Sequence, residues 1–203
     1  MDYNTIRIPF LSNDDIKSKA GLFRKKFWSN VIPVDIEKIA EFKLKIRIIP
    51  LPNLQQYCNV DAFIASNMKS IYIDNDSYFD ERNQNRFRFS LAHEVGHFVL
   101  HKDLYSVFNI KNFVDFNKFL KVAPQEQYKY LEVQANKFAS HLLVPRGKLA
   151  IEKQELFKAV RFQNQKIDLH SFDKVILNSY IASILAGTFG VSNKVVEIAL
   201  NDL

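Results

Sequence analysis

Two histidines and a glutamate in residues 93–97 have the spacing of a metal site on a helix. The run His93-Glu94-Val95-Gly96-His97 lies within an apolar, helix-forming stretch. Residues four apart on an α-helix differ by about 6 Å of rise and about 40° of rotation, so both imidazoles can bind one ion from the same face. Glu94 then lies beside the metal, where a general base could take a proton from metal-bound water. The motif indicates a zinc-dependent peptidase.

A catalytic zinc normally has three protein ligands, so a third is needed from elsewhere in the chain. His101 shares the histidine face but lies about 12 Å along the axis from His93, which favours a core or supporting role. Glu132 is the expected ligand because it borders the apolar stripe of the next long helix. Asn136 follows one turn later and could orient a histidine. A solvated position remains the alternative for Glu132, and His141 faces the opposite way.

The composition describes one sizeable globular domain. The 203 residues are 47% hydrophobic and 25% charged, which are ordinary values for a soluble protein. The single cysteine, Cys58, cannot form an internal disulfide, and neither a signal peptide nor a membrane-spanning run is evident. We therefore expect a cytoplasmic protein without a membrane partner. The net charge of +6 fits a nucleic-acid partner, an acidic protein or neither, because the basic residues are scattered.

The periodicity of the apolar residues predicts an α+β fold: a small antiparallel sheet packed against a mainly helical domain. Strands are expected from residue 43 to an end at Pro50 and Pro52, at 60–65 and at 70–74, with a hairpin loop at 66–69 and a substrate-binding edge at Ile71–Asp74. Helices are expected at residues 13–29, 34–41, from 83–86 to 101, 125–143, 148–162, from 171–173 to 186, and 192–200. Gly96 inside the motif helix suggests a close approach of another backbone or of the metal site.

The segment 102–124 shows little periodicity and several aromatic residues. A partly helical, packed connection is the favoured interpretation, with a lid over the substrate as the alternative. The donor that would stabilise the tetrahedral oxyanion is also open. The candidates are Tyr128, Tyr130, His141, Arg86 and Arg88.

Two sequence blocks resemble the ImmA/IrrE family of metallopeptidases. Residues 88–97 with Leu100-His101 look like its active-site helix, and residues 132–139 with 142–145 resemble its E-x-x-A-N-x-F-A and L-L-x-P block. Residues 33–40 are similar to its usual first helix. The resemblance implies a zincin-like fold, with Zn²⁺ (or Mn²⁺) on His93, His97 and Glu132 and with Glu94 as catalytic base. It also implies a protein substrate, since family members cleave helix-turn-helix repressors.

The expected organisation is a peptidase domain at 1–165 and a helical extension at 166–203 that packs on it. Residues 186–196 have helix-turn-helix spacing, so a DNA-binding regulator is one alternative function. Its second helix carries one basic residue, Lys194, together with Glu197 and Asp202, which favours packing or repressor docking over DNA contact. A non-catalytic metal module is the other alternative, but such a site needs no base like Glu94. His141 departs from the family pattern without an assigned role.

Overall fold

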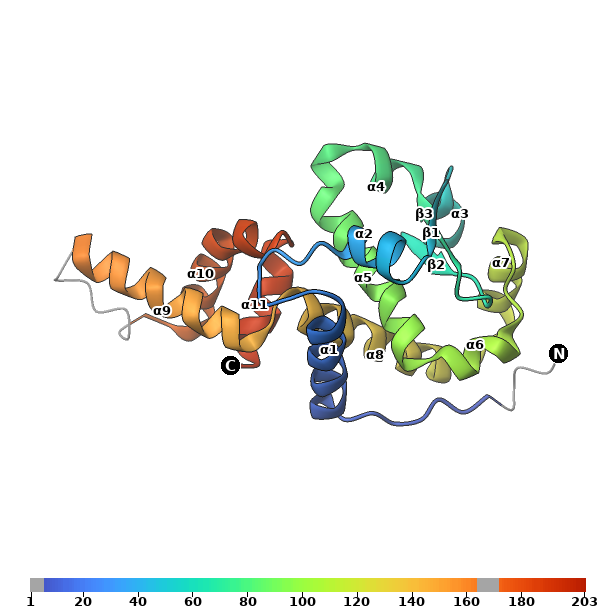
Figure 1. Cartoon of the computed structure of the whole chain (residues 1–203), viewed down its shortest axis with the longest axis horizontal. Coiled ribbons are helices and arrows are strands. Elements are labelled where there is room, and N and C mark those ends of the chain that lie inside the picture. Colours follow the sequence, from blue (N-terminus) through green and yellow to red (C-terminus); the bar gives the residue numbers. More distant parts are fainter. Residues whose placement is uncertain (1–5, 164–171) are drawn as a thin grey trace.

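The histidine-bearing helix α5 (Gln84–Leu100) lies in the middle of the fold, as the computed structural model in Figure 1 shows. The structure describes residues 6–163 and 172–203. One side of α5 packs against α8 (Gln125–Leu143), and another faces β2 (Ala62–Ile64) of a small sheet. Helix α1 (Asn13–Phe27) packs on α8. The predicted α+β architecture, with a small sheet beside a mainly helical body, is confirmed.

The sheet is mixed rather than antiparallel. Its strand order is β1-β3-β2, in which β3 (Ser70–Asp74) pairs antiparallel with β2 and parallel with β1 (Arg47–Leu51). The hairpin between β2 and β3 is the one predicted. The error concerned β1, whose connection to β3 includes α3 (Leu54–Cys58) and β2 and is therefore long enough for parallel pairing. Because β3 is hydrogen-bonded on both sides, Ile71–Asp74 is not the free edge that we expected for substrate.

The first strand also begins later than predicted. Helix α2 (Ile36–Lys38) continues as a π-helical turn, η2 (Ile39–Lys43), and thus occupies the start of the expected strand. Lys45 then has a positive φ of 58°, which separates this helix from β1. Pro50 lies inside β1 instead of ending it. An edge strand tolerates proline because one of its sides makes no ladder hydrogen bonds.

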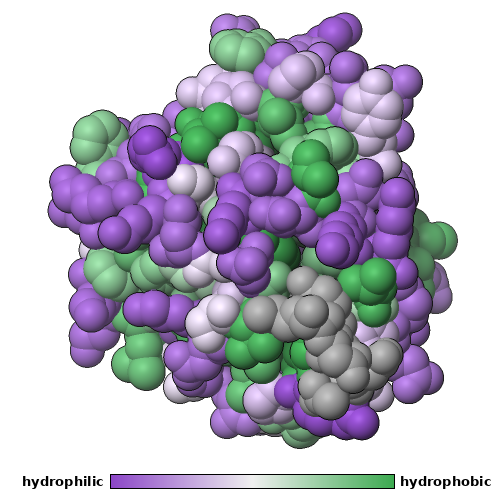
Figure 2. All heavy atoms as spheres, turned by 90° about the vertical axis from the view of Figure 1, so that its right-hand side faces the viewer, coloured by the Kyte–Doolittle hydropathy of each residue, from purple (hydrophilic) through white to green (hydrophobic). Residues whose placement is uncertain are grey.

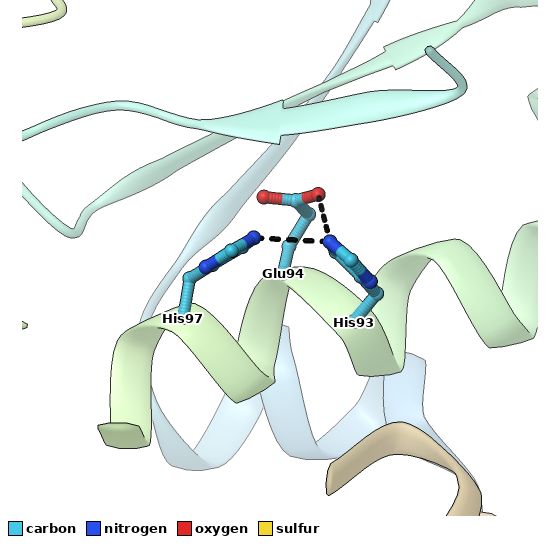
Figure 3. Close-up of side chains that lie close together, drawn as sticks. All are labelled: His93, Glu94 and His97. Atoms are coloured by element: carbon cyan, nitrogen blue, oxygen red, sulfur yellow. Dashed lines mark hydrogen bonds and ion pairs between the residues drawn. The ribbon is translucent and has the colours of Figure 1, made fainter. Parts of the chain in front are cut away.

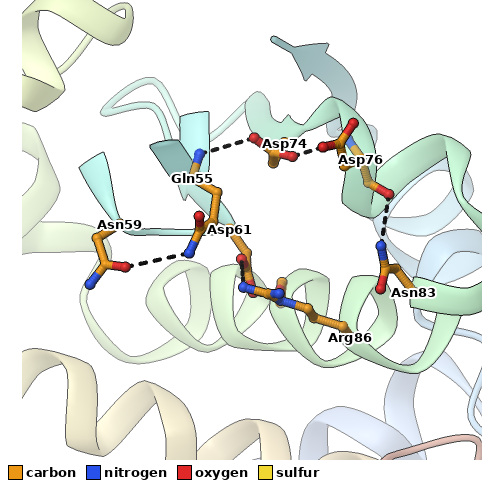
Figure 4. Close-up of polar contacts among 8 residues, drawn as sticks. Gln55, Asn59, Asp61, Asp74, Asp76, Asn83 and Arg86 are labelled. Carbon is orange, nitrogen blue, oxygen red and sulfur yellow. Dashed lines mark hydrogen bonds and ion pairs between the residues drawn. The ribbon is translucent and has the colours of Figure 1, made fainter. Parts of the chain in front are cut away.

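Short elements connect the sheet to α5. They are α4 (Asn75–Phe79) and the 3₁₀ turn η3 (Glu81–Asn83), neither of which was predicted. Asp74 anchors this region because its carboxylate accepts the backbone N–H groups of Gln55 and Asp76 (Figure 4). Arg86 near the start of α5 makes a bidentate pair with Asp61 beside β2, at 2.6 and 2.7 Å. These contacts fix the angle at which α5 passes beneath the sheet.

Gly96 lets α5 and α8 touch at backbone distance. A Cβ atom at this position would lie 3.2 Å from both Cα and O of Ala135, and 3.3 Å from the ring of Phe138. These separations are tighter than ordinary contacts, so alanine would push the helices apart. The expected close approach of another backbone at Gly96 is therefore present, and the backbone belongs to α8.

The segment 102–124 forms two helices, α6 (Lys102–Phe108) and α7 (Phe113–Val122). Four of its five aromatic residues, Tyr105, Phe108, Phe116 and Phe119, are buried, and Phe113 is partly buried. Figure 2 looks at this side of the molecule and shows small groups of hydrophobic residues among hydrophilic ones. The segment is thus a packed connection, as favoured, although Tyr105 and Phe116 also line a cleft beside His93 and His97.

The C-terminal region consists of α9 (Arg146–Gln163), α10 (Lys174–Phe189) and α11 (Asn193–Asn201). The expected domain boundary between residues 165 and 166 lies outside the described residues. Gly190, with φ of 61°, forms the turn between α10 and α11, and α11 also contacts α8. Within the described chain, no single helix is long and apolar enough to cross a membrane, although α10 and α11 meet that test as a pair bent by 116°.

Candidate metal centre

Three side chains of α5 converge beneath β2 (Figure 3). The Nε2 atoms of His93 and His97 lie 3.0 Å apart, and Oε1 of Glu94 lies 4.0 Å from Nε2 of His93. Glu132 approaches the same point from α8, with carboxylate oxygens 3.2 Å from Nε2 of His93 and 3.5 Å from Nε2 of His97. The four residues line a cleft of about 240 Å³. The structure therefore brings together all the residues that the sequence nominated around the metal.

The proton positions on His97 follow from a chain of buried hydrogen bonds that ends at the N-terminal segment. Nε2 of Gln134 donates to the carbonyl of Pro9 (2.8 Å), which can only accept, so Oε1 of Gln134 must face His101 (3.0 Å). His101 therefore carries its proton on Nε2 and presents a lone pair at Nδ1. His97 donates Nδ1–H to that lone pair (3.0 Å), which leaves its own Nε2 unprotonated.

His93 is oriented in the same way. Its Nδ1 faces Oδ1 of Asn136 at 2.9 Å, so Nδ1–H donates to that oxygen and Nε2 is the nitrogen that points into the cleft. The expected supporting contact of Asn136 is thus made with His93. His101 likewise supports His97 from behind and is not placed as a ligand.

The donor set fits a divalent metal ion. Two bare imidazole nitrogens and a carboxylate repel one another at these separations unless a cation lies between them. A proton competes with the metal ion for the space between these nitrogens and the carboxylate. Burial alone would lower the pKa of His93, but the hydrogen bond and charge of Glu132 raise it to about 9. The pKa of Glu132 is correspondingly lowered: the hydrogen bonds of both histidines outweigh its burial. Metal binding at neutral pH therefore displaces a proton.

Glu94 differs from Glu132 in position and environment. His93, Glu94 and His97 could by themselves bind a metal ion, because their potential ligand atoms all lie within 4.8 Å of one another. Glu132, however, lies closer to His93 Nε2 and has an oxygen near each histidine. Glu94 is 3% exposed, and its Oε2 has no hydrogen-bond partner among the described residues. Burial raises its pKa, so this carboxylate is suited to accepting a proton.

Four of the five candidates for the oxyanion donor lie away from the place where His93, His97 and Glu132 converge. Arg88 donates to the carbonyl oxygens of Gly190 and Val34, and Arg86 is paired with a carboxylate near the rim. Tyr130 is 55% exposed, and neither it nor His141 lines the cleft.

Tyr128 is the candidate that lines the cleft. Burial raises its pKa, as do the charges of Glu132 and Glu94, so the phenol remains a proton donor at neutral pH. Tyr105 lines the same cleft from α6, with its ring centroid 5.4 Å from that of His97, and burial raises its pKa well above the usual value. Sequence reasoning missed Tyr105, since α6 lacks a periodic pattern that would reveal which residue turns inward.

Gln134 was also missed, although the sequence contained a signal for it. It occupies the apolar stripe of α8 between Leu131 and Phe138, where a polar side chain must find a buried partner. That partner, His101, lies between α5 and α6, on a segment that is distant from α8 in the sequence.

The sequence was compared with known families and proteins. It matches the peptidase M78 family, described as the IrrE N-terminal-like domain, over residues 43–201. The chain belongs to this family. It is a metallopeptidase, a hydrolase of peptide bonds, and the ImmA/IrrE resemblance read from the two sequence blocks is confirmed. Comparison with curated proteins gave no significant match. The matched region includes both halves of the metal centre and most of the C-terminal helices.

Proposed function

We propose that this metallopeptidase is a zinc-dependent endopeptidase that cleaves a helix-turn-helix repressor. His93, His97 and Glu132 hold the metal in this proposal, and Glu94 is the catalytic base. The observation that supports these roles most directly is the convergence of three metal-binding groups beside a buried carboxylate that has a free oxygen. A purely structural metal site would leave such a carboxylate without a purpose.

The chemistry divides between the metal and the side chains around it. His93, His97 and Glu132 would hold a divalent ion, which would polarise the scissile carbonyl and make water acidic enough to attack near neutral pH. Glu94 accepts the proton of the attacking water and then delivers it to the leaving amine. Its raised pKa favours the first of these transfers, in which the carboxylate accepts the proton. Tyr128 and Tyr105 are positioned to donate a hydrogen bond to the oxyanion, because both line the cleft as neutral phenols.

Substrate binds along β2 in this proposal. The strand order leaves one side of β2 without a strand partner, and its residues Ala62 and Phe63 line the cleft above α5. An extended peptide could add to this edge through main-chain hydrogen bonds and present its carbonyl to the metal. The repressor as substrate rests on the family resemblance. Lys194 on α11 is paired with Glu197 at 3.2 Å, which supports a packing or docking role for α11 over DNA contact.

The decisive comparison is between Glu94→Gln and His93→Ala. Both variants should lose cleavage of a helix-turn-helix repressor, tested first with any repressor encoded beside this gene. Elemental analysis should find about one zinc per chain in Glu94→Gln and little in His93→Ala. Wild-type cleavage by Glu94→Gln would refute the role of the base. Cleavage of unrelated proteins but not of repressors would leave a peptidase with a different substrate.

A further inference from the structure

A second cavity adjoins the catalytic cleft. It has a volume of about 490 Å³ and lies among α1, α8, α9 and α11. Phe89 and Asn136 line both spaces. Asn136 is also the hydrogen-bond partner of His93, so the second cavity begins one side chain away from the metal centre. A polypeptide that leaves the cleft on this side would pass directly over it.

The walls of this cavity carry an excess of positive charge. Lys137, Arg146 and Lys194 line it; Arg146 pairs with the lining carboxylate of Asp202 at 2.7 Å, and Lys194 pairs with Glu197 at 3.2 Å. Lys137 makes no ion pair within the described part of the chain. The N-terminal end of α11, which has no side-chain cap, also borders the cavity and adds positive potential, whereas the start of α1 is capped by Ser12.

Two buried polar atoms of the lining residues lack partners. They are Nε of Arg146 and Nδ1 of His141, and no described residue forms a hydrogen bond with either. The side chains are only 7% and 6% exposed, so bulk water does not readily compensate them. Nη1 of Arg146 donates to Val144 O, and Nη2 donates to Asp202 and to Oγ of Ser140. Its Nε–H is therefore a donor that still lacks an acceptor among the described residues.

His141 responds to the same positive potential. Burial lowers its pKa to about 4, and the charges of Arg146, Lys17 and Lys137 contribute to this shift. Its Nε2 already faces Oδ1 of Asn13 at 3.1 Å. A negatively charged group in the cavity would offset these charges and favour a proton on Nδ1, which would then become a second donor.

We propose that this cavity is a substrate subsite that binds an acidic side chain of the cleaved polypeptide, near the scissile bond. Lys137 and Nε–H of Arg146 would hold the carboxylate. The apolar walls formed by Phe89, Val195 and Ile198 suit the methylene groups of glutamate better than the shorter aspartate. This subsite rests on the proposed peptidase function and specifies which substrates that function accepts.

The first test uses the zinc-loaded full chain and a peptide library prepared from a digested proteome. Cleaved sequences should be enriched in Glu, and less in Asp, at one position relative to the cut. Lys137→Glu should abolish or reverse this enrichment, with a loss of about tenfold for acidic peptides, as expected when a charge pair is replaced by repulsion. Lys129→Glu is the matched control, because Lys129 is an exposed lysine on the same helix that lines neither cavity.

The second test measures binding without turnover. One cleaved peptide and its Glu→Gln counterpart are titrated into zinc-loaded Glu94→Gln protein, with and without Lys137→Glu. The Glu peptide should bind at least fivefold more tightly, and only when Lys137 is present. Cleavage with no acidic preference, or equal binding of the two peptides, would overturn the subsite and leave the peptidase function intact. If the zinc-loaded wild type cleaves no peptide, the proposed function fails, and the subsite with it.

Discussion

Gln134→Leu should weaken zinc binding although Gln134 touches no metal ligand. Gln134 accepts Nε2–H of His101, which in turn accepts Nδ1–H of His97. Leucine has a similar volume but cannot accept a hydrogen bond. His101 would then either bury an unpaired N–H group or change tautomer. The second choice would set two N–H groups against each other and favour the His97 tautomer with a proton on Nε2, where the metal should bind.

The expected size follows from these contacts. His101 and Gln134 are 2% and 5% exposed, so water cannot replace the lost partner. A buried donor without a partner costs about 1–3 kcal/mol, and tenfold in affinity corresponds to about 1.4 kcal/mol. Zinc affinity should therefore fall by about 10–100-fold, the range typical for groups that support a metal ligand.

Competition with a fluorescent zinc chelator at fixed pH measures this change, and the visible spectrum of the Co²⁺-loaded protein reports the ligand geometry. The control is Gln127→Leu. Gln127 holds the same N-terminal segment by accepting the backbone N–H of Ile8, but it contacts no histidine. Its zinc affinity should stay within about twofold of the wild type, since its contact lies outside the relay. Equal affinities for the two variants would refute the proposed relay through His101.

Three further changes test other parts of the structure. Gly96→Ala should destabilise the fold by about 1–3 kcal/mol and weaken zinc binding, because the new Cβ would lie 3.2 Å from the backbone of α8. Gly21→Ala is the control, since Gly21 has open space around it, and it should change neither property. Denaturation and zinc titration measure the two effects. Glu132→Gln should lose most bound zinc by elemental analysis, and zinc retention at the wild-type level would contradict its role as a ligand. Burial and then the charge of Arg146 lower the pKa of His141 to about 4 in the folded protein. Between pH 6.5 and 4, this histidine is therefore protonated in the unfolded chain but not in the folded one. His141 thus contributes stability above pH 6.5 that is lost as the pH falls to 4. His141→Gln should therefore reduce the acid slope of the unfolding free energy by up to about 1.4 kcal/mol per pH unit, measured by urea denaturation of metal-free protein; an unchanged slope would count against this pKa.

The helix that carries His93 and His97 could be predicted from the sequence, because the pattern that specifies it lies within one short segment. The spacing of His93 and His97 implies one helical face, and α5 ends where the apolar run predicted. The boundaries of α8 were also predicted, since Pro124 and Pro145 flank a periodic stripe. Glu132 was selected by its place beside that stripe and by the family resemblance, because no local rule connects residues 35 positions apart.

Strand pairing was harder to predict from the sequence. The alternation at 43–48 suited a strand, yet the chain forms a π-helical turn up to Lys43 and starts β1 at Arg47. The side of β3 that β1 joins and the direction in which it runs depend on the path of the connection between them, and apolar periodicity contains no such information. The error about the substrate edge followed from this, since a strand is an edge only in relation to its neighbours.

The sequence by itself predicted the chemistry of this protein: two candidate ligands and a candidate base on one helix, and a resemblance to a family of peptidases. Only the tertiary structure decided how that chemistry is supported. The contact of α5 with α8 at Gly96 brings Glu132 to the histidines, and the relay through His101 and Gln134 holds the tautomer of His97. Both depend on distances between segments far apart in the chain, which packing sets and which the order of residues along a helix does not reveal.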